Sequence, residues 1–104
     1  MLLYNVTISI DPEIEDSWLT WMREKHINDV MNTGCFLEAR LCRVHGEEEG
    51  GLTYAVTYLC PSQKDFDTYS TELSKALQAE HLNKFSPRFA AFRTMLTVVE
   101  EFKK

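Results

Sequence analysis

A capped helix set between two strand-like segments constrains the fold of this chain more than any other feature. Residues 2–10 alternate between apolar and more polar side chains, which is typical of a strand with one buried face. Asp11 can accept hydrogen bonds from free helix amides, Pro12 suits the first helical position, and Gly34 is a natural helix stop. We therefore predict a strand over 2–10 and a helix between Asp11 and Gly34.

The remainder of the chain repeats this plan. Residues 35–44 and 52–60 predict two further strands, joined by a glycine-rich connection whose glutamates Glu47, Glu48 and Glu49 we expect in solvent. A second helix is predicted to begin after Ser62, in a sequence that resembles a capping box. Pro87 should end it, with a short helix capped by Ser86 and carrying Phe89 and Phe92, before a fourth strand over 94–102.

The order βαββαβ predicts an α+β, ferredoxin-like fold. Because crossover connections are right-handed, the four-stranded antiparallel sheet should carry both helices on one face. We expect one domain over 1–104, since the chain has the length of a single domain and contains no long linker.

The other sheet face is predicted to hold small, β-branched or mixed side chains with few charges. Its expected members are Leu3, Asn5, Thr7, Ser9, Thr53, Ala55, Thr57 and Leu59. A second sheet can pack on such a surface, and two-fold dimers are the commonest oligomers. We therefore expect a homodimer closed sheet to sheet, with a monomer whose open face is solvated as the alternative.

Charge and composition argue against several classes of partner. Eleven basic and sixteen acidic residues give a net charge of −5, and the basic residues form no stripe, so we expect no nucleic-acid or membrane partner. Residues 1–4 lack a signal-like pattern and no apolar stretch reaches membrane-spanning length, which predicts a cytoplasmic protein.

Cysteine and histidine spacing gives no metal or disulfide pattern. Cys35, Cys42 and Cys60 are an odd set without a C-x-x-C motif, and small buried apolar residues are their simplest interpretation. Cys60, at a strand end, is the candidate for a reactive thiol. We expect no metal, because the three histidines, His26, His45 and His81, lie on different predicted elements.

The first helix carries the chemically distinctive side chains. Projection at about 100° per residue places one group on the side facing the sheet, with Arg23 and Ile27 largely outside it. That group is Ile14, Trp18, Leu19, Trp21, Met22, His26 and Val30. His26 should point toward the sheet, where an imidazole could act as a general base. The alternative is a structural histidine at the edge of the core.

Part of this pattern resembles a known family. The residues that carry the resemblance are Trp18-x-x-Trp21-Met22, His26-Ile27-x-x-Val30-x-x-Thr33-Gly34-x-Phe36, Tyr54 and Tyr58. They are similar to an uncharacterised bacterial family classed as a domain of unknown function (family 4286), which implies no particular activity. More broadly, Gly34-Cys35 and the segment over 86–92 resemble the dimeric α/β-barrel group, which includes antibiotic-biosynthesis-type monooxygenases and haem-degrading enzymes.

The broader resemblance also bears on cofactors. Haem-degrading members pair an asparagine in the first strand with a tryptophan and a histidine on the second helical segment. Asn5 fits the first position, whereas the tryptophan position falls on Tyr69 and the histidine position on Phe92. The iron ligand is then missing unless His81 replaces it. We therefore expect no cofactor, haem included.

These observations lead to two hypotheses about function. In the first, the homodimer binds a small apolar or aromatic molecule in a cleft between the first helix and the sheet, with the enzyme version a cofactor-independent monooxygenase or isomerase that uses His26 as base. The expected ligand-binding residues are Asn5, Trp18, Trp21, Met22, Tyr54 and Tyr58. In the second, the same aromatic residues fill the core of a non-catalytic structural or protein-interaction module.

Overall fold

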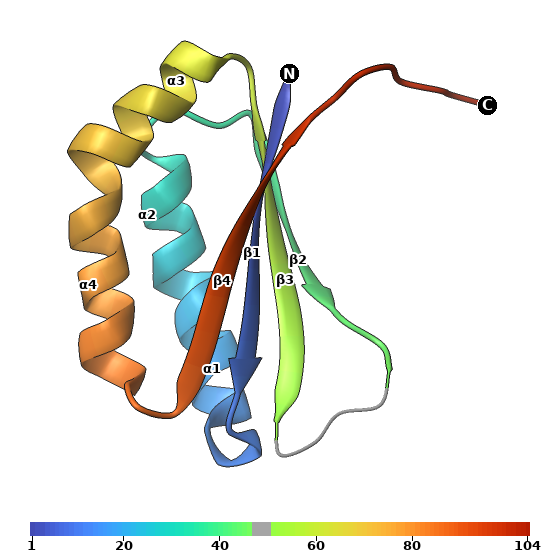
Figure 1. Cartoon of the computed structure of the whole chain (residues 1–104). Helices are drawn as coiled ribbons and strands as arrows, with labels where there is room; N and C mark the ends of the chain where they lie inside the picture. Colours follow the sequence, from blue (N-terminus) through green and yellow to red (C-terminus); the bar gives the residue numbers. More distant parts are fainter. Residues whose placement is uncertain (47–50) are drawn as a thin grey trace.

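The computed structural model describes residues 1–46 and 51–104, and the expected solvent position of Glu47, Glu48 and Glu49 lies outside this part of the chain. Its sheet has four antiparallel strands in the order β2-β3-β1-β4, with the helices on one face (Figure 1). The strands are β1 (Leu2–Ile10), β2 (Glu38–Arg43), β3 (Leu52–Cys60) and β4 (Phe89–Thr97). The expected α+β, ferredoxin-like fold is confirmed.

The first crossover begins as expected. The Asp11 carboxylate accepts a hydrogen bond from the Glu13 amide at 2.9 Å, and Gly34 leaves the helix with a φ of 78°, which glycine adopts readily. The helical segments are η1 (Pro12–Ile14, a 3-10 turn), α1 (Glu15–Trp21), η2 (Met22–His26, a π-helix) and α2 (Ile27–Met31).

The second crossover also combines α-helical and π-helical turns. Ser62 caps it by accepting a hydrogen bond from the Asp65 amide at 3.2 Å, and its hydroxyl donates to the Asp65 carboxylate at 2.7 Å. The segments are α3 (Gln63–Thr68), η3 (Tyr69–Leu73, a π-helix) and α4 (Ser74–Phe85). The described helices include none long and apolar enough to cross a bilayer.

The predicted bounds of two strands are wrong. The second strand begins at Glu38 rather than at residue 35, because Cys35 and Phe36 turn into the core instead of pairing. The fourth strand spans Phe89–Thr97 rather than residues 94–102, and the short helix expected before it is absent. Residues 89–97 pair with β1 along its whole length. This pairing makes a strand of residues 89–92, which the local sequence predicted as part of a helix.

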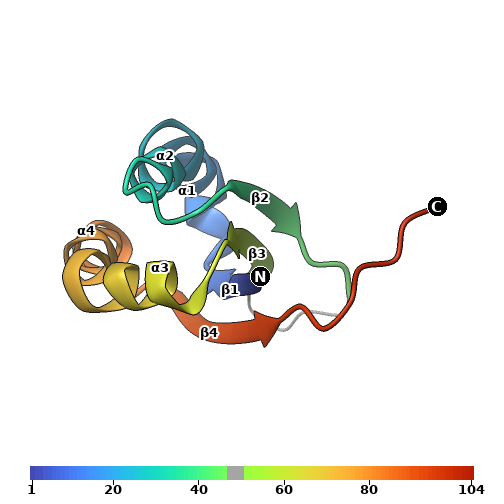
Figure 2. The same cartoon turned by 90° about the horizontal axis from the view of Figure 1, so that it is seen from above.

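The core lies between the sheet and the helices, while the second sheet face is uncovered in this single chain (Figure 2). Side chains alternate between these faces along each strand: Tyr4, Ile8 and Val56 face the helices and are buried. On the uncovered face, Phe92 and Leu96 are 63% and 46% exposed. Beyond β4, the chain end extends away from the helices (Figure 2).

Candidate functional site

Large side chains fill the space between α1 and the sheet. Trp18 is 0% exposed, its ring lies 5.1 Å from that of Tyr54, and Met22 is 1% exposed. The polar atoms of both rings are satisfied, because the Trp18 indole N–H donates to His81 Nε2 at 3.0 Å and the Tyr54 hydroxyl donates to Glu15 at 2.6 Å. Trp18 and Tyr54 are therefore core, and a space of only about 20 Å³, lined by Met22, His26 and Val30, lies between the later part of this crossover and the sheet.

Asn5 lies on the opposite side of the sheet from the helices. Its side-chain amide donates to Thr7 at 3.0 Å and its carbonyl oxygen accepts from Thr57 at 3.1 Å. The expectation that Asn5 lines a cleft beside the first helix is wrong, because strand alternation directs Tyr4 and Val6, not Asn5, toward the helices.

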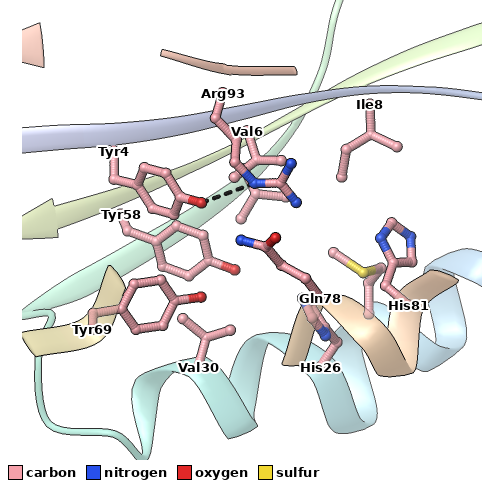
Figure 3. Close-up of a pocket in the computed structure, with 12 residues that line it drawn as sticks. Tyr4, Val6, Ile8, His26, Val30, Tyr58, Tyr69, Gln78, His81 and Arg93 are labelled. Carbon is pink, nitrogen blue, oxygen red and sulfur yellow. Dashed lines mark hydrogen bonds between the residues drawn. The ribbon is translucent and has the colours of Figure 1, made fainter. Parts of the chain in front are cut away.

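Three spaces share lining residues of α4 and β4. A narrow internal cavity of about 20 Å³ is flanked by two open depressions of about 180 and 190 Å³, and Gln78 and Arg93 line all three. Together these spaces form what we call the α4–β4 pocket, and Figure 3 shows the residues that line its internal cavity. Of the expected site residues, Met22, His26 and Tyr58 line its internal cavity.

Three tyrosines line the internal cavity, and their hydroxyls point toward the Gln78 amide (Figure 3). Arg93 Nε donates to the Tyr4 hydroxyl at 3.0 Å, which holds the guanidinium over the pocket. Burial raises the pKa of Tyr4, Tyr58 and Tyr69 alike. All three phenols therefore stay protonated near neutral pH and remain able to donate hydrogen bonds.

Two histidines stand side by side at the other end of this cavity. The ring centroids of His26 and His81 are 5.6 Å apart, and Trp21 stacks on both, at 4.9 and 5.6 Å. Burial lowers the pKa of His81 to about 4 and also lowers the pKa of His26, so both imidazoles are neutral at neutral pH. Among the described residues, His26 Nδ1 is the buried side-chain polar atom without a hydrogen-bond partner.

Both π-helical turns lie where the helices meet this cavity. Met22 and His26 belong to η2, and Tyr69 begins η3. A π-turn inserts one extra residue into a helix and is frequent at functional sites, because it redirects a side chain at a local cost in stability. The two turns point to the α4–β4 pocket independently of its shape.

Cys60 is not the exposed thiol that its place at a strand end suggested. It is 0% exposed, and its sulfur lies 3.4 Å from the Cys35 carbonyl oxygen and 3.3 Å from that of Ser62. Burial also raises the pKa of this thiol. Both properties make Cys60 unreactive and structural.

The four-stranded antiparallel sheet with its helices on one face defines the class of ferredoxin-like α+β proteins. Within it, the chain belongs to the family described as Domain of unknown function (DUF4286), whose model matches residues 1–99. The family resemblance predicted from sequence is confirmed. None of the curated proteins is significantly similar in sequence to this chain.

Solved structures with this fold have diverse activities. A dimeric ferredoxin-like protein from an uncultured marine organism is 18% identical over 100% of both chains, with a TM-score of 0.67. The heme-degrader MhuD from Mycobacterium tuberculosis, solved with two hemes bound, is 20% identical over 99% of this chain and 100% of its own, with a TM-score of 0.71. SnoaB from Streptomyces nogalater, a cofactor-independent oxygenase, is 8% identical over 99% and 98%, with a TM-score of 0.70.

The expectation of no cofactor, haem included, is wrong. MhuD holds heme on this fold, and a variant of it holds manganese protoporphyrin IX. The assignment of the iron-ligand position to Phe92 is also wrong, because Phe92 lies in β4 on the uncovered sheet face. Gln78 and His81 are the α4 side chains that line the cavity.

Some residues of the pocket have the chemistry that a haem requires. The free nitrogen of His26 is a donor type that iron accepts, and the Arg93 guanidinium suits a carboxylate. However, the internal cavity of about 20 Å³ holds roughly one water molecule. A tetrapyrrole therefore does not fit this conformation, and α4 would have to separate from β4 to admit one.

Proposed function

We propose that the protein is a single-domain, cytoplasmic homodimer that binds a small apolar or aromatic molecule in the α4–β4 pocket. The observation that carries this proposal is the convergence of three spaces on Gln78 and Arg93, next to the unpartnered Nδ1 of His26. Buried polar atoms in proteins are rarely left without partners, and a bound molecule would supply the missing one.

The walls of the pocket suit a single aromatic ring. Its depressions, of about 180 and 190 Å³, are lined by rings that include Tyr4, Phe66, Tyr69 and Phe89. A cavity of roughly 150 Å³ is large enough for benzene. Arg93 adds a cation to an otherwise acidic protein, so a carboxylate or phenolate on the ring would be favoured at the mouth.

If the protein is an enzyme, the chemistry that these groups support is proton transfer. A neutral His26 can take a proton from an acidic C–H or O–H of the bound molecule and return it to another atom. That step by itself isomerises the ligand, and it is also the first step by which a monooxygenase would prepare a carbanion for reaction with O₂.

The dimer would form through the uncovered sheet face. Phe92 and Leu96 are exposed there in the single chain, beside small and β-branched side chains of β1 and β3. A structurally similar protein is described as dimeric and ferredoxin-like. The three cysteines are free, and Cys35 and Cys60 stay unpaired although Cys60 contacts the Cys35 carbonyl, which suits a reducing compartment such as the cytoplasm.

Isothermal titration calorimetry with 4-methylbenzoate tests the ligand site. We expect saturable binding that weakens at least about tenfold in Arg93→Gln, because a charge-assisted hydrogen bond is lost. Lys75→Gln, which removes an exposed cation elsewhere on α4, is the matched control and should bind normally. A parallel absorbance titration with hemin measures whether the pocket opens for a larger ring.

Light scattering during size-exclusion chromatography at micromolar concentration tests the dimer. We expect a dimer mass for the natural chain and a monomer mass for Phe92→Glu, which would bury a charge in the interface. Leu82→Glu changes a similarly exposed side chain on α4 and should remain dimeric. A natural chain of monomer mass would contradict this part of the proposal.

The second candidate function is a structural or interaction module. The packed residues under α1 favour it for that half of the molecule. If 4-methylbenzoate, hemin, p-cresol and p-xylene all fail to bind, this candidate replaces the ligand-binding proposal for the whole chain.

A further inference from the structure

The internal cavity of the α4–β4 pocket has the size of one oxygen atom with its hydrogen. Its volume is about 20 Å³, whereas the adjoining depressions are nearly tenfold larger. The small cavity is also where the two histidines meet, because His26 and His81 both line it. A ligand ring seated in a depression could therefore extend only one small polar substituent into this space.

The Trp18 indole fixes which nitrogen of His81 carries the proton. Its N–H donates to His81 Nε2, so Nε2 has no hydrogen and, in the neutral ring, Nδ1 does. The indole has no second role as an acceptor, since it is a donor only. His81 therefore offers one N–H donor of fixed orientation, held by a tryptophan that is itself fully buried.

His26 supplies the complementary group. Its Nδ1 is buried and unpartnered among the described residues, and its ring stands 5.6 Å from that of His81 and tilted by 34°. The 5.6 Å between the ring centroids is of the order that one bridging oxygen atom spans, because each hydrogen bond is about 2.7–3.2 Å long. Of the small substituents, a hydroxyl can both donate and accept, whereas a methyl group can do neither.

We propose that the α4–β4 pocket recognises a hydroxylated aromatic molecule, whose hydroxyl group lies between His26 and His81, with Trp18 as the positioning residue that fixes the His81 tautomer. This inference rests on the proposed function, because it names the ligand class of the same pocket. It assigns Trp18 a role beyond core packing.

The natural chain and two isosteric probes give the first test. p-Cresol and p-xylene differ in one hydroxyl against one methyl group, and calorimetry should give p-cresol an affinity at least about tenfold higher. Equal binding of the two, or binding of 4-methylbenzoate without p-cresol, would overturn the hydroxyl inference and leave the ligand-binding proposal intact. Binding of none of these molecules would overturn both.

The tautomer is measured without any ligand. In ¹⁵N-resolved NMR spectra of the natural chain, we expect His81 to show a protonated Nδ1 and an unprotonated Nε2. The opposite assignment would overturn the role of Trp18 even if no Trp18 variant folds.

If Trp18→Phe folds, it removes the indole N–H and keeps an aromatic ring. We then expect mixed His81 tautomers and a p-cresol to p-xylene affinity ratio that falls toward one. Tyr54→Phe removes a core hydroxyl that contacts Glu15 rather than a histidine, and it should keep the ratio of the natural chain. A ratio unchanged in Trp18→Phe would show that the tryptophan only packs.

Discussion

The two halves of this molecule share a topology but differ in what fills the space between helix and sheet. Under α1 and η2 the facing residues are large and apolar, with Trp18, Met22 and Tyr54 nearly inaccessible to solvent. Under α4 the facing residues include Gln78 and His81, and a pocket opens toward β4. The first half therefore supplies stability, and the second half supplies the polar groups that could act on a ligand.

This contrast explains why the aromatic residues in the first helix were misleading. Tryptophan and tyrosine bury 150–250 Å² each, so they are most often found in a core. The histidine in the same helix belongs to the other half, because His26 lies at the end of η2 and faces α4. A functional site here is therefore built from residues of both crossovers and of β4.

The largest expected effect is the loss of stability when a buried side chain of the filled half is removed. Trp18→Ala removes a fully buried ring and leaves a cavity, so we expect the free energy of unfolding to fall by about 3–5 kcal/mol. Urea denaturation followed by circular dichroism measures this change. Leu82→Ala, at a position 53% exposed on α4, is the control and should change stability by no more than about 0.5 kcal/mol.

Lowering the pH should reduce the free energy of unfolding through His81, which lies where the two halves meet. The pKa of His81 is about 4 in the folded chain against an ordinary value of 6.5. Between these values the unfolded chain binds more protons, so the free energy of unfolding falls as the pH drops from 6.5 to 4, by up to about 3 kcal/mol. Above pH 6.5 this contribution is complete.

Urea denaturation at several pH values, compared with His81→Gln, isolates this effect. Glutamine does not titrate and its carbonyl oxygen can still accept from the Trp18 indole. We expect a shallower fall in stability between pH 6.5 and 4 in the variant. Identical slopes for the two proteins would mean that His81 does not stay neutral when folded.

A substitution in the open half should have the smallest effect on stability. Gln78→Leu removes an amide that lines the pocket, and we expect the free energy of unfolding to change by less than about 1 kcal/mol. Binding of 4-methylbenzoate should nevertheless weaken, because the polar mouth is altered. Asn83→Leu, an exposed site on α4, is the matched control and should leave binding unchanged.

Much of the fold could be predicted from the sequence because its signals are local. Alternation identified the faces of β1 and β3, and Asp11, Gly34 and Ser62 marked helix ends through their own hydrogen-bonding or backbone chemistry. The start of β4 could not be predicted in this way. Residues 89–93 extend because they pair with β1, a partner about eighty residues away.

The site was harder to predict because it depends on irregular helical geometry. The projection at 100° per residue left Ile27 outside the buried side, yet Ile27 packs against the core. The π-turn η2 precedes it and shifts the helical phase. Tyr69 was noted only at the tryptophan position of the haem-degrading proteins, and Tyr4 was not singled out. Nothing local distinguished Gln78 or Arg93, whose importance arises from where α4 meets β4.

Chemical-shift mapping of the ¹⁵N-labelled protein with p-cresol tests the central claim most directly. We expect the perturbed backbone amides to concentrate in α4 and β4, around Gln78, His81 and Arg93, together with His26 in η2. Perturbations centred on α1 and Tyr54 would contradict the assignment of the α4–β4 pocket as the ligand site, and the absence of any perturbation at millimolar p-cresol would contradict the assignment of a hydroxylated aromatic ligand to it.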